Sequence, residues 1–226
     1  MAELARDDLT KQVPTCPAWT LADLIEHTGR VHRWMIAAVQ GDGSPQVAED
    51  DGPVDGASLG DWFQRGVDEA VRVMSAMEGT EARWTWFPPD QTAGWYFRRI
   101  AQETLVHRID AELAAGVDVM EVEPALAADG VDEMCDVFIP SATGQPIGGR
   151  GETLHLHATD VEGEWLLTLH PEHVEVSRGH AKGDAALRGP ARDLLLMMWG
   201  RDPLGDVEHF GDESVIATFR AAAKVG

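Results

Sequence analysis

The nonapeptide QETLVHRID places a carboxylate, Glu103, and an imidazole, His107, four residues apart in a segment with helical periodicity. Residues four apart project from one side of an α-helix, and that side also carries Tyr96, Ile100 and Ala111. An ionised carboxylate on a buried line is costly unless it is paired, protonated or bound to a metal. The pair therefore predicts either a local polar contact between the two side chains or a bound ion.

A second imidazole, His27, lies on an apolar row of another predicted helix and is expected to face the core. Two imidazoles and one carboxylate are sufficient for a catalytic divalent metal with an open position, and these ligand types suit zinc. Asp110 follows His107 by three residues and is expected to accept its second ring N–H. His32 is expected to lie on a different face of its helix. The sequence thus offers His27, Glu103 and His107 as candidate metal ligands, and the alternative is a satisfied core histidine beside a local contact between Glu103 and His107.

The histidines of the second half are expected to have another role. His155 and His157 share one face of a predicted strand, and His170 and His173 flank a turn. In the sequence no cysteine or carboxylate cluster accompanies them. A second metal site is therefore not predicted there.

Composition narrows the class of partner. Eighteen basic and 39 acidic residues give the 226-residue chain a net charge of −21, which repels nucleic acid and anionic membrane surfaces. An anionic small substrate would need a local arginine cluster. Five arginines lie near the candidate ligands in sequence, and most are expected to be solvated or paired with acidic neighbours: Arg30, Arg33, Arg98, Arg99 and Arg108.

The expected compartment is the cytoplasm. No apolar run approaches the roughly 18 residues of a membrane span, and the first residues lack the apolar region of a secretory signal. The two cysteines, Cys16 and Cys135, form no C-x-x-C motif and no disulfide framework.

Capping and breaker residues predict four helices in the first part of the chain. Thr20 with Asp23 opens the first, which ends at Gly41, and Ser58 opens a second that ends at Gly79. A third is predicted over about residues 95–115, and a fourth from Pro124. The connections among these amphipathic segments favour a bundle.

The pattern changes after a segment rich in glycine and proline. Four short alternating segments, 153–159, 164–170, 173–178 and 184–189, indicate strands, and two short helices are predicted over 191–200 and 212–225. We therefore expect an α+β two-domain protein. Residues 1–140 would form a helical bundle, 141–151 a linker, and 152–226 a small α+β domain with an antiparallel sheet.

Two stretches, VPTCPAWTLADLIEHTGRVHRW and RRIAQETLVHRIDAELAAG, resemble the mycothiol-dependent maleylpyruvate isomerase family within the larger DinB-like group. The segments HATDVEGEWLLTL, DAALRGPARDLLLMMWGRDPL and FGDESVIATFRAA resemble the C-terminal α+β domain of that family. The resemblance covers nearly the whole chain.

The resemblance implies a DinB-like bundle that holds a divalent metal, usually zinc, through a histidine of a DLxxH helix and the glutamate and histidine of an ExxxH helix. These fall on His27, Glu103 and His107. It also implies mycothiol as cofactor and a small electrophile as substrate. The metal-activated thiol adds to a double bond and leaves after rotation, or is transferred permanently by the S-transferases of the group.

One departure from the family pattern is the shortened start, since only about a dozen residues precede the PxCPxW loop, too few for a bundle helix of several turns. This leaves the three ligands in place but hints at packing against another chain, as in a homo-oligomer. The family also contributes a C-terminal arginine to the substrate site; Arg192, Arg201 and Arg220 are candidates, and none is assigned.

Two other functions are open from the residues. The first is a non-catalytic metal- or ligand-binding module that keeps both domains. The second is a zinc hydrolase, which a set of two histidines and one glutamate also supports. The hydrolase ranks last because the sequence has no H-E-x-x-H motif.

Overall fold

The computed structural model describes residues 1–6, 8–41, 52, 58–139 and 147–222. The chain divides into two compact units, Met1–Met120 and Glu121–Gly226. This division precedes the linker expected at 141–151, of which residues 141–146 lie outside the described residues. The expected α+β class with two domains is confirmed.

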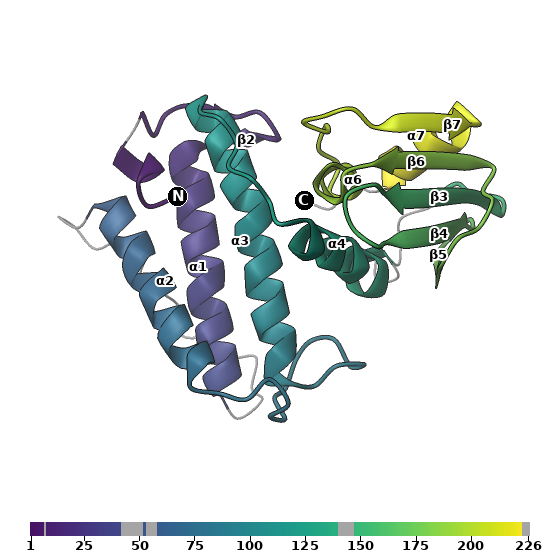
Figure 1. The fold of residues 1–226 in the computed structure, drawn as a ribbon. Coiled ribbons are helices and arrows are strands. Elements are labelled where there is room, and N and C mark those ends of the chain that lie inside the picture. The colour runs from purple at the N-terminus through teal and green to yellow at the C-terminus, as the bar shows by residue number, and fades with distance from the viewer. Residues whose placement is uncertain (7, 42–51, 53–57, 140–146, 223–226) are drawn as a thin grey trace. The chain divides into compact units, whose positions relative to one another are not determined.

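The described part of the first unit has three long helices: α1 (Leu21–Gln40), α2 (Leu59–Ser75) and α3 (Ala93–Ala115). Helix α1 lies between α2 and α3 and packs against both (Figure 1). The predicted capping box is confirmed, because Thr20 accepts from the backbone of Asp23 and the Asp23 carboxylate accepts from the backbone of Thr20. Helix α3 ends where Gly116 takes the left-handed conformation, at φ 74°.

Before α1 the described residues form a short 3₁₀ turn, η1 (Leu4–Arg6), and a hairpin of β1 (Gln12–Val13) and β2 (Cys16–Thr20). Helices α1 and α2 approach closely where Gly29 meets Trp62. A Cβ atom at Gly29 would lie only 2.2 Å from the Trp62 ring. The side chain of Arg33 lies over the same indole at 3.9 Å and donates to the Trp62 carbonyl at 2.7 Å.

The second unit begins with α4 (Pro124–Glu133), which continues into a π-helical turn, η2 (Met134–Phe138). Helix α4 packs on α6 of the same unit, so the fourth predicted helix groups with the sheet and not with the three helices of the first unit. The remaining elements are β3 (Glu152–Ala158), β4 (Glu164–Leu169), β5 (Val174–Arg178), β6 (Ala185–Gly189), α6 (Ala191–Met198), β7 (Glu208–Gly211) and α7 (Glu213–Ala222).

The five strands form one sheet in the order β5-β4-β3-β6-β7. The sheet is mixed, so the expectation of an antiparallel sheet was wrong at one pair, where β3 and β6 run parallel. The reason is a crossover: after β5 at one edge, the chain returns to the other side of β3. Strand β7, which the sequence pattern did not predict, closes the opposite edge.

The two faces of the sheet differ in chemistry. Alternate side chains of β3 and β4, such as Leu156 and Trp165, are buried, and α6 and α7 pack against β3 and β6. The intervening residues His155, His157 and Glu164 lie on the opposite face. Register pairs His157 directly with Glu164.

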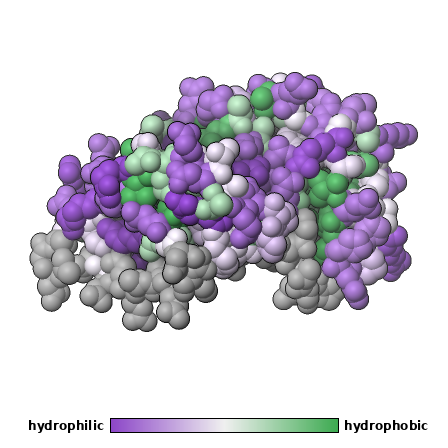
Figure 2. Space-filling view, turned by 90° about the horizontal axis from the view of Figure 1, so that it is seen from below, coloured by the Kyte–Doolittle hydropathy of each residue, from purple (hydrophilic) through white to green (hydrophobic). Residues whose placement is uncertain are grey.

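Hydrophilic residues predominate on the face shown in Figure 2, and apolar residues form separate groups among them. This agrees with the strong net negative charge of −21. Within the described ranges, no helix is both long enough and apolar enough to cross a membrane.

Candidate metal centre

The three predicted ligands converge at one point between α1 and α3. Glu103 and His107 lie one turn apart on α3, and His27 projects from α1. Oε1 of Glu103 lies 3.3 Å from Nε2 of His27 and 3.3 Å from Nε2 of His107. Ligand atoms around a tetrahedral zinc with bonds of about 2.0–2.1 Å lie about 3.3 Å apart. The donor atoms therefore have types that suit zinc, and the separations of the two imidazole nitrogens from Oε1 of Glu103 are compatible with a tetrahedral ion.

The ring of His107 is held in a fixed orientation by Asp110. Nδ1 of His107 donates to Oδ2 of Asp110 at 3.0 Å, as predicted from the spacing of three residues. The Asp110 side chain is fully buried, and its other oxygen accepts a hydrogen bond from the Thr15 hydroxyl at 2.6 Å. A proton fixed on Nδ1 directs the other ring nitrogen towards Glu103, the arrangement typical of metal-binding histidines.

The second oxygen of Glu103 is paired with an arginine of the same helix. Arg99, whose side chain is 4% exposed, contacts Oε2 of Glu103 at 3.0 Å. Burial alone would raise the pKa of Glu103, but hydrogen bonds from His107 and His27 and the charge of Arg99 hold it well below its usual range. Glu103 is therefore an anion at neutral pH, as a metal ligand must be.

The surroundings of His107 favour positive charge. Burial alone would lower the pKa of the His107 imidazole, but the adjacent carboxylates of Asp110 and Glu103 raise it to about 9. Two carboxylates around one ring therefore stabilise a cation at this position, whether it is a proton or a metal ion.

The indole of Trp19 flanks the cluster. Its ring centroid lies 4.6 Å from that of His27 and 6.2 Å from that of His107. Trp19 sits at the end of β2, directly before the Thr20 cap, so the hairpin positions it over the start of α1. Neither Trp19 nor Thr15 was singled out by sequence reasoning, although both lie in the VPTCPAW loop that carries the family resemblance.

The two histidines of α1 differ in exposure, and the expectation for His27 was wrong. His27 was expected to face the core, yet its side chain is 38% exposed. His32, which was expected on a different face from His27, is 2% exposed, and its Nε2 lies 2.8 Å from the Thr104 hydroxyl. His32 is buried because α2 and α3 cover α1 on two sides, so the buried arc of α1 is wider than one apolar stripe.

Most of the arginines near the candidate ligands are paired, as predicted. Arg30 pairs with Glu26, and Arg108 pairs with Glu112, each at helical spacing. Among the C-terminal candidates, Arg192 pairs with Asp193, Arg201 donates to the Trp199 carbonyl, and Arg220 pairs with Asp202.

Sequence reasoning missed a single carboxylate that lies beside His155 and His157. The pairing of β3 with β4 brings Glu164 opposite His157, and His180 approaches from the end of β5. The second unit thus holds another group of histidines around one carboxylate.

The structure defines a class of two-domain protein. A helical unit carries a cluster of two histidines and one glutamate, and an α+β unit follows it in the chain. The sequence profile of the mycothiol maleylpyruvate isomerase N-terminal domain matches residues 1–112, and that of the C-terminal domain of the same family matches residues 125–218. The chain belongs to the mycothiol maleylpyruvate isomerase family.

No curated protein sequence matches this chain closely enough to count as a relative. Among solved structures, a UbiJ-SCP2 ubiquinone synthesis protein aligns with 20% identity over 46% of this chain and 93% of that one, with a TM-score of 0.30. A stereoselective inverting sec-alkylsulfatase from Pseudomonas sp. aligns with 15% identity over 88% of this chain and 32% of that one, with a TM-score of 0.30. This chain thus spans about a third of the length of the alkylsulfatase, and neither likeness carries a functional argument.

Proposed function

We propose that this protein is a mycothiol-dependent metalloenzyme that isomerises or conjugates a small electrophile. The family match supports mycothiol-related isomerase chemistry. In this proposal His27, Glu103 and His107 hold a divalent metal ion, zinc by the nature of the donors. The observation that carries the proposal is the 3.3 Å separation of both imidazole Nε2 atoms from one carboxylate oxygen.

The chemistry that a bound zinc ion supplies is Lewis acidity, which deprotonates a coordinating thiol at neutral pH. The residues of this chain prepare the site for it. Glu103 contributes a full negative charge, because Arg99 and the histidines keep it ionised. Asp110 orients His107, and His27, Glu103 and His107 would hold the ion as three protein ligands.

Isomerisation and transfer differ in the fate of the thiol. In both, the thiolate sulfur forms a bond to one carbon of the double bond, and the π electrons move to the conjugated carbonyl to give an enolate. The enolate either expels the thiolate again or takes up one proton at carbon. An isomerase releases the thiol after rotation about the resulting single bond, so the thiol is not consumed. A transferase leaves the new carbon–sulfur bond intact and consumes one thiol for each electrophile.

The test is turnover of maleylpyruvate by the zinc-loaded protein with and without mycothiol, followed by product analysis. We expect thiol-dependent turnover that His27→Gln reduces at least tenfold, whereas His170→Gln, a surface change in the other unit, leaves it unchanged. A trans product with thiol conserved assigns an isomerase, and an adduct assigns a transferase. Absence of thiol-dependent turnover over a panel of electrophiles would overturn the proposal in favour of a binding module.

A further inference from the structure

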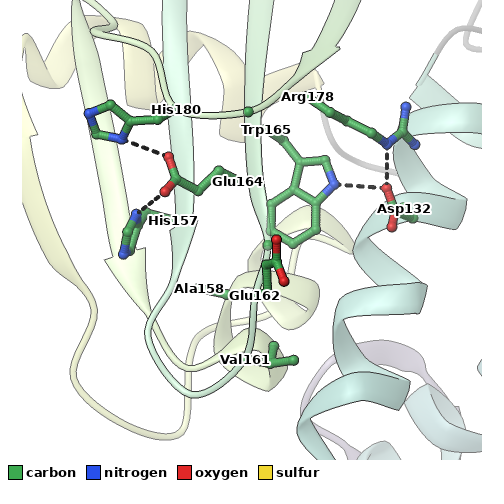
Figure 3. Close-up of a pocket in the computed structure, with 11 residues that line it drawn as sticks. Asp132, His157, Ala158, Val161, Glu162, Glu164, Trp165, Arg178 and His180 are labelled. Atoms are coloured by element: carbon green, nitrogen blue, oxygen red, sulfur yellow. Dashed lines mark hydrogen bonds and ion pairs between the residues drawn. The ribbon is translucent and has the colours of Figure 1, made fainter.

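Three histidines surround the carboxylate of Glu164 on the face of the sheet opposite to the buried strand residues. Nε2 of His155 lies 3.0 Å from Oε2 of Glu164, and Nδ1 of His180 lies 2.8 Å from the same oxygen. Nδ1 of His157 lies 3.2 Å from the other oxygen, Oε1. Figure 3 shows the rings of His157 and His180 on either side of the Glu164 carboxylate.

The backbone fixes this arrangement. His155 and His157 are two residues apart on β3 and share a face, and the register of β3 with β4 sets Glu164 against His157. His180 lies two residues after the end of β5, and the intervening Gly179 amide donates to the Glu164 carbonyl at 3.0 Å, which anchors that turn. The four side chains therefore come from three neighbouring strands or their ends.

The donor set is that of a metal site. One ligand atom each from His155, Glu164 and His180 lie within 4.8 Å of one another, and His157 stands at the second carboxylate oxygen. Imidazole nitrogen with a single carboxylate suits zinc, cobalt, nickel and copper, and does not suit calcium or magnesium. The hydrogen-bond separations of 2.8 and 3.0 Å would open by a few tenths of an ångström to reach the spacing of about 3.3 Å around a tetrahedral ion.

We propose that His155, Glu164 and His180, with His157 as an auxiliary ligand, bind a divalent transition metal ion of the zinc class. This site lies in the second unit, shares no residue with the centre of His27, and does not depend on the proposed function. Its donors match that centre in type, two imidazoles and one carboxylate, and the protein's net charge of −21 favours cation binding.

Access to the site is graded. The side chain of His155 is 7% exposed, that of Glu164 is 24% exposed and that of His180 is 83% exposed. The buried His155 holds one ligand atom in a fixed position, and the exposed His180 leaves the site open for an ion to enter from solvent. A pocket of about 500 Å³ lies alongside and includes His157, Glu164 and His180 in its lining.

Other residues that line the same pocket are joined by a separate network of hydrogen bonds. Asp132 accepts from Arg178 at 2.7 Å and from the Trp165 indole at 2.9 Å, as Figure 3 shows. These contacts neutralise the Asp132 carboxylate without involving the histidines. The carboxylate of Glu164 is therefore the anionic ligand of the proposed site, and the histidine cluster borders a preformed pocket.

The test is titration of the full chain with Co²⁺ and Zn²⁺, followed by visible absorption for cobalt and by calorimetry for zinc. The Glu103→Gln variant removes a ligand from the other centre and serves as the background. In it we expect one equivalent of metal to remain bound, and His180→Ala to weaken that binding at least tenfold. Because the side chain of His180 is 83% exposed, its removal does not challenge the fold.

The matched control is His173→Ala. His173 is also an exposed histidine of the second unit, and its ring stacks on that of His170 at 4.4 Å, away from Glu164. It is expected to leave metal binding unchanged, while Glu164→Gln weakens it as His180→Ala does. No bound metal in the Glu103→Gln background, or equal binding by His180→Ala and His173→Ala, would overturn this site and leave the first centre untouched.

Discussion

The buried carboxylate of Asp110 accepts the Nδ1 proton of His107 at 3.0 Å, so the opposite nitrogen of the ring faces Glu103. This hydrogen bond sets both the tautomer and the direction of a ligand that the helix alone would leave free to rotate. A chain of contacts runs from the Thr15 hydroxyl through Asp110 to His107, and so ties the N-terminal loop to α3.

Removing the charge of Asp110 is expected to weaken the metal centre without removing a ligand. We expect Asp110→Asn to lower zinc affinity by about ten- to a hundredfold. Competition with a chromophoric chelator measures this change. Thr15→Val removes only the hydroxyl that contacts Asp110, so it should lower the affinity less. Equal affinity of Asp110→Asn and the unchanged protein would show that Asp110 does not orient a metal ligand.

Two glutamates on α3 offer a matched pair for testing the ligand assignment. Glu103 pairs with Arg99 and Glu112 pairs with Arg108, both with the arginine four residues earlier on the helix. Only Glu103 also faces the histidines His27 and His107. Glu103→Gln is therefore expected to lose the zinc of the first centre, and Glu112→Gln to retain it. Elemental analysis after gel filtration gives the number of zinc ions per protein chain. Loss of zinc from both variants would indicate unfolding and would contradict the ligand assignment.

The buried His32 makes the stability of the fold depend on pH. Thr104 donates its hydroxyl proton to the Ile100 carbonyl at 2.6 Å, so it accepts from Nε2 of His32. Among the described residues, no group hydrogen-bonds to Nδ1 of His32. Burial lowers the pKa of His32 from 6.5 to about 4, because a charged ring would lack solvent there.

The sign of this effect follows from linkage. Between pH 6.5 and 4 the unfolded chain binds a proton at His32 that the folded chain does not. The free energy of unfolding should therefore be highest above pH 6.5. It should decrease as the pH is lowered from 6.5 to 4, and the contribution of His32 to this decrease is up to about 3 kcal/mol. Urea unfolding of the unchanged protein and of His32→Phe across this range isolates the contribution. Parallel pH profiles of the two proteins would contradict the assignment.

The contact between Gly29 and Trp62 predicts a steric effect on stability. A Cβ at residue 29 would lie 2.2 Å from the indole, so Gly29→Ala must displace Trp62 or separate α1 from α2. We expect a loss of about 1–3 kcal/mol in the free energy of unfolding. Trp62→Leu should be destabilising by itself through lost packing. The double variant should lose less free energy of unfolding than the two single variants lose together. If chemical denaturation shows that the two losses simply add, the proposed clash is ruled out.

Local signals predicted the helices of this protein well. The Thr20 and Asp23 capping box, the Pro124 start and the Gly116 stop are short-range features, and each lies where the sequence indicated. The spacing of Glu103 and His107 likewise fixed their common side, because that depends only on helical geometry. The exposure of His27 could not be predicted, since it depends on how far α2 and α3 wrap around α1.

Long-range pairing limited what the sequence could show of the sheet. Strand β6 runs parallel to β3, and the sequence of neither strand indicates in which direction its partner runs. The position of Glu164 beside His155 and His157 depends on the register of β3 with β4, which a shift of one residue would reverse. Strand β7 is exposed along all four residues and so lacks the alternating pattern that would have indicated it.

Because its ligands lie on two different helices, the first centre would also work as a mechanical link. An ion held by His27 on α1 and by Glu103 and His107 on α3 would join segments that are far apart in the chain but packed together in the fold. Binding to the folded chain alone raises the unfolding free energy by about 2.7 kcal/mol at a free metal concentration of a hundred times Kd. The melting temperature of the first unit would then rise with zinc concentration, and chelation would loosen α1 from α3.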